Sequence, residues 1–188
     1  MNSPARKTRR PLEGLKVLDL THGVAGPYCT MVLGDLGCDI VKIEKPGRGD
    51  ATRYMNVSER FHTDIPRVGG DYFLAINRNK RAITLELKSP EGRKICEELA
   101  QWADIVVQNF RPGVTQRLGL DYESLRKINP RLIYGNISAY GTEGNMSDKA
   151  GMDIAVRAQA MVQAQPEVWE LVTPAKLGIL TFARHGAG

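Results

Sequence analysis

Several features are scarce or missing in this 188-residue chain, and each absence excludes a class of protein. Its three cysteines, Cys29, Cys38 and Cys96, form no CxxC pair, so we expect reduced thiols rather than a disulfide framework or a metal site. No apolar run approaches the roughly 20 residues of a membrane-spanning helix, and no secretory signal is present. We therefore expect a cytoplasmic protein, or a mitochondrial matrix protein in a eukaryote, with neither metal nor membrane as a partner.

The chain is basic, with 26 Lys and Arg against 21 Asp and Glu, but the excess lies at one end. Residues 1–10 contain Arg6, Lys7, Arg9 and Arg10 and no acid, and the rest of the chain carries 22 basic and 21 acidic residues. A basic stripe of the kind that binds nucleic acid is therefore missing from the body of the protein. We expect residues 1–10 to be a disordered tail and nucleic acid not to be a partner.

The apolar pattern predicts alternating strands and helices. A strand over residues 15–21, a helix over 27–36 and a strand over 38–44 form a βαβ unit of about 30 residues. Further strands are predicted over 104–110 and 132–138, and further helices over 89–102, after Asp121 and over 151–163. Residues 72–76 and 83–87 are expected to be short extended or mixed pieces that flank the polar turn 77–80. The expected fold is α/β, a Rossmann-like open parallel sheet with helices on both faces.

Polar or cationic segments follow the predicted strands, where ligands bind in such sheets. They are residues 22–26 at the start of a helix, Lys45 and Arg48, residues 109–111, and residues 138–141. Together with the polar turn 77–80, they suit a phosphorylated adenosine, because cations and helix N-termini bind phosphate and an aromatic ring can stack on the base. In the alternative interpretation, the glycines of residues 23–26 only allow close packing and the charges are ordinary surface residues.

A dinucleotide-dependent oxidoreductase is a competing hypothesis. Glu44 stands about 20 residues after Gly23, where a ribose-binding acid belongs in that fold. The glycine fingerprint fails, however, because Ala25 occupies the position of its second glycine. Cations also follow Glu44 at once, which favours a phosphate over an unmodified ribose.

Four ordered blocks resemble the N-terminal part of the family III CoA-transferases, which include formyl-CoA and carnitine CoA-transferases and α-methylacyl-CoA racemase. They are residues 11–53 (beginning PLEGLKVLDLTHGVAGP), 77–95 (NRNKRAITLELKSPEGRKI), 109–120 (NFRPGVTQRLGL) and 129–141 (NPRLIYGNISAYG). The resemblance implies a Rossmann-like large domain that is incomplete in this chain, and an interlocked homodimer. It assigns residues 11–164 to the CoA-binding region and leaves 165–188 as a divergent or truncated end.

The resemblance also implies which residues contact coenzyme A. By motif match they are His22, Val24, Ala25, Lys45, Ile76, Asn77, Arg78, Asn79, Lys80, Asn109, Phe110, Arg111, Arg117, Ser138, Ala139, Tyr140 and Gly141. Most of them follow strands that the periodicity predicts independently.

The transferases of this family use an aspartate nucleophile to move CoA from an acyl-CoA thioester to a carboxylic acid. The lead-in to that aspartate resembles residues 174–179 here, but Ala183, Arg184 and His185 stand near its expected position, and no aspartate follows Asp153. The catalytic residue is therefore unassigned. We expect a truncated or frame-altered CoA-transferase that is inactive alone, or, alternatively, a non-catalytic CoA-binding or dimerisation module.

Overall fold

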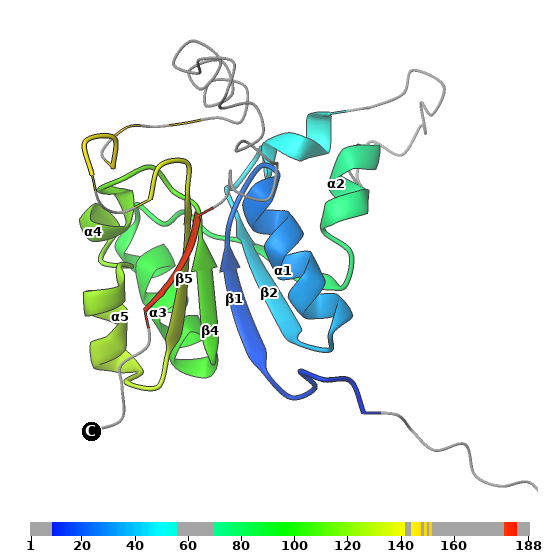
Figure 1. The fold of residues 1–188 in the computed structure, drawn as a ribbon, viewed down its shortest axis with the longest axis horizontal. Coiled ribbons are helices and arrows are strands. Elements are labelled where there is room, and N and C mark those ends of the chain that lie inside the picture. The colour runs from blue at the N-terminus through cyan, green and yellow to red at the C-terminus, as the bar shows by residue number, and fades with distance from the viewer. Residues whose placement is uncertain are drawn as a thin grey trace, which may run out of the picture.

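Six strands form one sheet in the order β3-β2-β1-β4-β5-β6 (Figure 1). The computed structural model describes residues 9–55, 70–141, 144–147, 149, 151 and 179–183. The first five strands are parallel, which confirms the predicted α/β Rossmann-like sheet, whereas β6 pairs antiparallel with β5 and was not predicted. The strands are β1 (Lys16–Leu20), β2 (Asp39–Glu44), β3 (Lys80–Thr84), β4 (Ile105–Gln108), β5 (Ile133–Ser138) and β6 (Ile179–Ala183).

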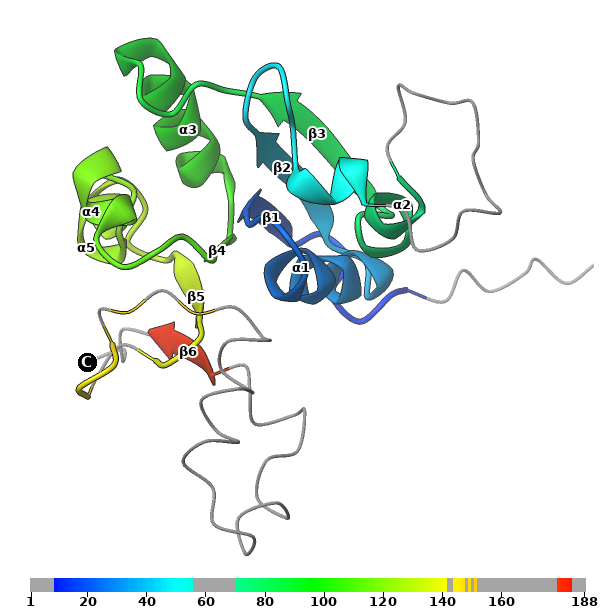
Figure 2. The ribbon, with the colours of Figure 1, turned by 90° about the horizontal axis from the view of Figure 1, so that it is seen from above.

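Helices cover both faces of the sheet, as predicted (Figure 2). One face carries α1 (Ala25–Asp35) and α2 (Asp71–Ile76), with the short 3₁₀ helix η1 (Ala51–Tyr54) between them in the chain. The other face carries α3 (Pro90–Trp102), α4 (Val114–Leu118) and α5 (Tyr122–Ile128). Residues 152–163 of the predicted last helix, the predicted boundary at 164–165 and residues 1–8 of the predicted tail lie outside the described residues.

Two of the helices begin where the sequence predicts a capping side chain. The Ser89 hydroxyl accepts a hydrogen bond from Gly92 N at 3.0 Å, and Pro90 follows as the first residue of α3. The Asp121 carboxylate accepts from Ser124 N at 3.1 Å and begins α5. These caps satisfy N–H groups that a helix cannot pair internally, so both helices start at the expected residues.

Two expectations for residues 72–87 are wrong. Residues 72–76 form α2 rather than an extended piece, because Phe73 and Ile76, spaced three apart, both turn inward from one helical turn. The following strand, β3, begins at Lys80 and not at Ile83. It is an edge strand with four of its five residues exposed, so it lacks the alternation of buried and exposed residues by which a strand is recognised.

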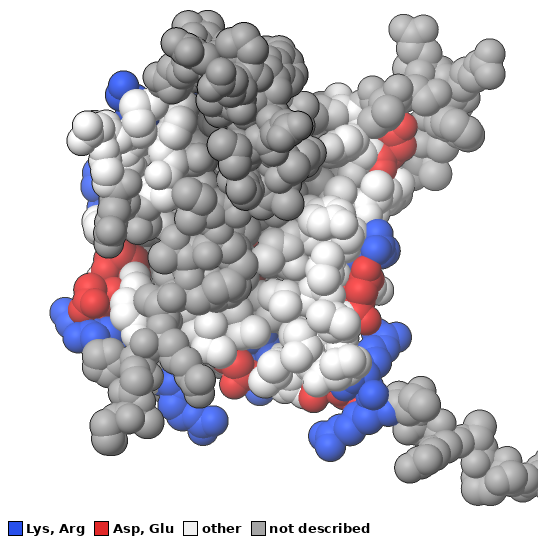
Figure 3. All heavy atoms as spheres, viewed as in Figure 1, with Lys and Arg blue, Asp and Glu red and all other residues white. Residues whose placement is uncertain are grey.

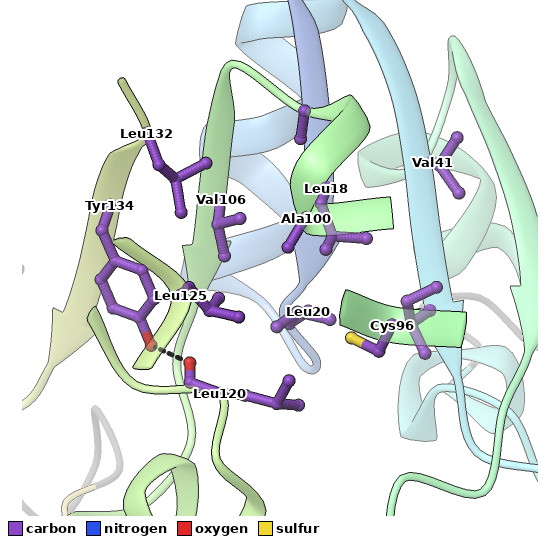
Figure 4. Close-up of a cluster of buried hydrophobic side chains, with 12 residues drawn as sticks. Leu18, Leu20, Val41, Cys96, Ala100, Val106, Leu120, Leu125, Leu132 and Tyr134 are labelled. Atoms are coloured by element: carbon purple, nitrogen blue, oxygen red, sulfur yellow. Dashed lines mark hydrogen bonds between the residues drawn. The ribbon is translucent and has the colours of Figure 1, made fainter. Parts of the chain in front are cut away.

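A separate apolar core lies on each face of the sheet. On the α3 side, Leu18, Val106 and Leu125 pack with Cys96, and the Tyr134 hydroxyl donates to Leu120 O at 2.9 Å (Figure 4). Burial raises the pKa of the Cys96 thiol to about 12, so this cysteine packs as an apolar residue. All three cysteines are free.

The outer face of α1 is unusually apolar. Val24, Tyr28, Val32 and Leu36, spaced four apart, are all exposed, and the surface over α1 is largely uncharged (Figure 3). Because both faces of α1 are apolar, the sequence pattern predicts a helix here but does not indicate which face packs against the sheet. None of the helices in the described part of the chain combines the length and apolarity needed to cross a membrane.

Candidate CoA-binding site

The candidate site is built on the turn between β1 and α1, at the carboxyl edge of the sheet. Gly23 has a φ of +74°, which favours glycine. Gly26 is required for another reason, because a Cβ there would lie 2.4 Å from Thr21 Cβ. The packing interpretation of these glycines is therefore correct for Gly26, whereas Gly23 provides the change of direction.

Two side chains from elsewhere in the sequence fix the first half of this turn. The Asn109 amide, at the end of β4, accepts from His22 N at 2.9 Å and donates to His22 O at 2.7 Å. The Asp50 carboxylate, from the loop after β2, accepts from Gly23 N at 3.2 Å. The backbone of this turn is thus held from both neighbouring strands.

The second half of the turn presents unpaired N–H groups. Among the described residues, Val24 N, Ala25 N and Gly26 N have no hydrogen-bond partner, and α1 has no side-chain cap. These groups stand at the positive end of an 11-residue helix. A helix N-terminus of this kind can bind an anion such as a phosphate.

The ring of His22 lies at the rim of the turn, against Phe110. The two ring centroids are 5.6 Å apart and the rings are tilted by 42°. Desolvation by the surrounding protein lowers the pKa of His22 below its usual value, although the nearby Asp50 charge opposes the shift. The shift favours the neutral imidazole, whose ring lies beside that of Phe110.

Exposed cations surround the same edge of the sheet. Lys45 and Arg48 follow β2, and Arg111 follows β4, and within the described residues none of them forms an ion pair. Arg117, on α4, is also exposed. The loop after β2 returns to the turn, because Asp50 binds Gly23 N. Lys45 and Arg48 are thereby kept on the site's edge of the sheet.

The end of β5 contributes a polar group without a partner. Ser138 Oγ is buried and has no hydrogen-bond partner in the described structure. An unpaired buried hydroxyl is uncommon, and a bound ligand is one way to satisfy it. Ala139, Tyr140 and Gly141 follow at the same edge. No cluster of three His, Cys, Asp or Glu side chains suited to a metal ion occurs within the described residues.

Comparison with known proteins identifies the family. A sequence model described as CoA-transferase family III matches residues 12–179. The chain belongs to CoA-transferase family III. It is 43% identical over 151 residues to mouse succinyl-CoA:glutarate CoA-transferase, covering 80% of this chain and 33% of that protein.

Further members show the same partial coverage. Acetyl-CoA:oxalate CoA-transferase of Acetobacter aceti is 44% identical over 156 residues, covering 82% of this chain and 38% of that protein. A CAIB/BAIF family protein from Brucella suis superposes with a TM-score of 0.74 at 40% identity, covering 81% of this chain and 40% of its own. This family III chain therefore spans about a third of the length of the curated relatives that it matches.

The structure does not bring every predicted CoA contact to this edge. Arg78 and Asn79 directly precede β3, whose first residue, Lys80, pairs with Ile40 near the start of β2, so these two residues lie toward the amino edge of the sheet. There Arg78 forms a two-pronged ion pair with Asp35, and Asn79 donates to the same carboxylate. Arg78 and Asn79 therefore do not join the strand ends in the way that the sequence suggested, whereas Asn77 Oδ1 accepts from Lys80 Nζ, which also bonds Pro27 O in the first turn of α1.

Lys80 is a second exception, because its ammonium group points inward. The side chain is 1% exposed, and its Nζ lies 3.0 Å from Asp19 Oδ2. It also donates to Pro27 O at 2.8 Å and to Asn77 Oδ1 at 2.9 Å. The prediction that Lys80 binds CoA directly finds no support in these contacts.

The expected position of the nucleophile also lies away from the turn. Ala183 pairs with Tyr134, near the start of β5, and so lies at the amino edge of the sheet. Arg184 and His185 lie outside the described residues. For this family III chain, the catalytic carboxylate remains unassigned.

Sequence reasoning missed the buried charges beneath the turn, chiefly Asp19, Lys42 and Asp50. Two of these three charges could have been recognised in the sequence. Asp19 and Lys42 each interrupt an apolar strand, and a charge at a buried strand position needs a partner. The partners themselves could not be read from the sequence, because Asp19 meets Lys80 across β2 and Lys42 meets Asp50 only where the loop after β2 folds back.

Proposed function

We propose that this chain is the CoA-binding part of a family III CoA-transferase, which exchanges CoA between an acyl-CoA thioester and a carboxylic acid. The observation that carries this proposal is the set of N–H groups on Val24, Ala25 and Gly26, at the start of α1, that have no partner within the described part of the chain. CoA carries a diphosphate and a 3′-phosphate, and anions of this kind suit both the helix N-terminus and the surrounding cations.

The predicted contacts divide into groups by what each can offer CoA. Lys45 and Arg111 supply positive charge to the phosphates, and the rings of His22 and Phe110 supply a surface for the adenine. Ser138 Oγ supplies a hydrogen bond deeper along the edge. Asn109 holds the turn through its side chain, so a direct contact from Asn109 to CoA would come from its main chain.

We do not propose that this chain catalyses the transfer by itself. Transfer through an aspartyl intermediate needs a carboxylate near the thioester, and no aspartate follows Asp153 in the sequence. We expect the purified chain to bind CoA without exchanging it between acids. The interlocked homodimer that the resemblance implies is likewise a proposal, which analytical ultracentrifugation tests directly.

Calorimetric titration with CoA tests the proposed function. We expect saturable binding of CoA and at least tenfold weaker binding by the variant Lys45→Glu at low salt, because charge reversal repels the phosphates. The matched control is Lys127→Glu, which makes the same charge change on exposed α5 near the amino edge and should leave the affinity unchanged.

Two outcomes would contradict the proposal. One is the absence of CoA binding at millimolar concentration by the folded chain. The other is equal binding of NAD and CoA, which would favour the dinucleotide-dependent oxidoreductase instead.

A further inference from the structure

Two lysine–carboxylate pairs are buried directly beneath the candidate site. Lys42 Nζ lies 3.0 Å from Asp50 Oδ2, and Lys80 Nζ lies 3.0 Å from Asp19 Oδ2. All four side chains are at most 1% exposed. Burying an ion pair costs desolvation energy that its attraction often fails to recover, so such pairs are weak evidence of stabilisation. Two such pairs lie close together here, and holding the neighbouring backbone in position explains them better than stabilisation does.

The first pair is bonded to both sides of the turn. Lys42 Nζ donates to Thr21 O at 2.6 Å, just before the turn, and Asp50 Oδ1 accepts from Gly23 N at 3.2 Å, inside it. Asp50 is itself held by Thr52, whose N and Oγ1 donate to the same oxygen at 3.0 and 2.8 Å. The Asp50 carboxylate is thus held in place by Thr52, independently of its bond to Gly23 N.

The second pair is bonded to the start of α1. Lys80 Nζ donates to Pro27 O, in the first turn of that helix. Asp19 accepts from Thr21 N at 2.9 Å and from Thr30 Oγ1 at 2.6 Å. Together the two pairs hold the backbone on either side of Val24, Ala25 and Gly26, whose N–H groups are free.

We propose that Asp50 and Lys42 are positioning residues that set the backbone of this turn so that its free N–H groups converge on an anion. Because Gly23 N donates to Asp50, this N–H group is not available to the ligand, and the backbone that leads into α1 is held in place. Lys42 cancels the negative charge of Asp50, which would otherwise repel an anion bound a few residues away. Lys80 and Asp19 support the same arrangement from the helix side.

This inference rests on the proposed function only in taking the anion to be a phosphate of CoA. The double variant Asp50→Ala/Lys42→Met removes both charges together, so no unpaired charge is left buried. In the ligand-free chain, we expect the Gly23 amide to lose its protection from hydrogen exchange, measured by NMR, while amides in the second half of α1 keep theirs. We also expect the Kd for CoA to rise at least tenfold, with little change for pantetheine, which lacks phosphate.

Two control variants separate positioning from loss of stability. Leu125→Ala destabilises the core on the opposite face of the sheet and should leave both Gly23 protection and CoA affinity unchanged. The conservative double variant Asp50→Asn/Lys42→Met leaves no buried charge unpaired and keeps an oxygen that can accept from Gly23 N, so it should retain Gly23 protection and bind CoA within about threefold of the unaltered chain. If Asp50→Ala/Lys42→Met fails to fold, Asp50→Leu/Lys42→Met fills more of the vacated space without restoring an acceptor for Gly23 N, and it provides the same comparison.

The possible results are distinguishable. Unchanged Gly23 protection and unchanged CoA affinity in a folded Asp50→Ala/Lys42→Met chain would overturn the positioning role. Loss of protection in Asp50→Asn/Lys42→Met equal to that in Asp50→Ala/Lys42→Met would also overturn it, because the acceptor oxygen at residue 50 would then play no part. If the unaltered chain binds no CoA, the proposed function fails, and the exchange measurement alone decides whether Asp50 positions the turn.

Discussion

Gly23 and Gly26 lie three residues apart in one turn, yet a side chain is excluded from each for a different physical reason. At Gly23 a Cβ would meet nothing within 4 Å, and the restriction is the positive φ. At Gly26 the restriction is contact with Thr21. The two positions therefore respond differently to the same substitution.

Gly26→Ala should destabilise the protein more than Gly23→Ala. Alanine at 26 forces β1 and α1 apart, and overpacking of this kind costs about 1–3 kcal/mol. Alanine at 23 adds only the strain of a left-handed backbone, which costs about 1 kcal/mol. Urea denaturation measures both, and a larger loss at Gly23 would contradict the close approach of Gly26 to Thr21.

The imidazole of His22 reports the electrostatics of the site. Desolvation lowers its pKa and Asp50 raises it, so Asp50→Asn should lower the pKa of His22 further. NMR titration of the ring protons against pH gives both values. A pKa for His22 at or above about 6.5, its ordinary value, would show that the ring is more hydrated than the structure indicates.

At the scale of helices and strands, the β1-α1-β2 unit and the two capped helices could be predicted, because each is specified locally. Ser89, Pro90 and Asp121 mark helix starts by their own chemistry. By contrast, α2 has only six residues, and β3 is exposed at the edge, so neither repeats its pattern long enough to be recognised. The antiparallel pairing of β6 depends on a partner far away in sequence.

The same distinction applies to the candidate site. Lys45, Asn109 and Ser138 could be nominated because each directly follows or ends a predicted strand, and the parallel sheet brings those ends to one edge. The inward direction of Lys80 could not be predicted. It depends on the Asp19 carboxylate, which lies across β2 from β3, and no local pattern encodes that contact.

The cap of α3 gives a prediction at this scale. Ser89→Ala removes the acceptor for Gly92 N and should cost about 1 kcal/mol of stability. Ser147→Ala, in an exposed turn, is the matched control, because its hydroxyl bonds only a local carbonyl, Gly144 O. Equal stability of Ser89→Ala and the unaltered chain, measured by chemical denaturation, would contradict the capping role.

For the whole molecule, buried carboxylates make the free energy of unfolding depend on pH. Burial alone would raise the pKa of Asp50 and of Glu44, but ion pairs with Lys42 and Arg53 and hydrogen bonds from nearby groups outweigh it, so both values are lowered. The unfolded chain therefore takes up protons first as pH falls. The free energy of unfolding should be at its full value above the ordinary carboxyl range, about pH 4, and decline below it.

Denaturation curves at a series of pH values measure this decline. The variant Glu44→Gln/Arg53→Met, which removes one ion pair, should show a shallower decline than the unaltered chain. An identical slope in both proteins would mean that Glu44 contributes nothing to the acid dependence.

The reversal of direction between β5 and β6 determines where the chain enters and leaves the sheet. Ile179 pairs with Ser138 at the edge that carries the turn, whereas Ala183 pairs with Tyr134, four residues or about 13 Å back along β5. The end of β5 and the start of β6 thus both lie on the side of the sheet that carries the candidate site. A fluorophore or surface tether attached at Ala183 would be held on the opposite side of the sheet from the candidate site, leaving that edge open in an immobilised chain.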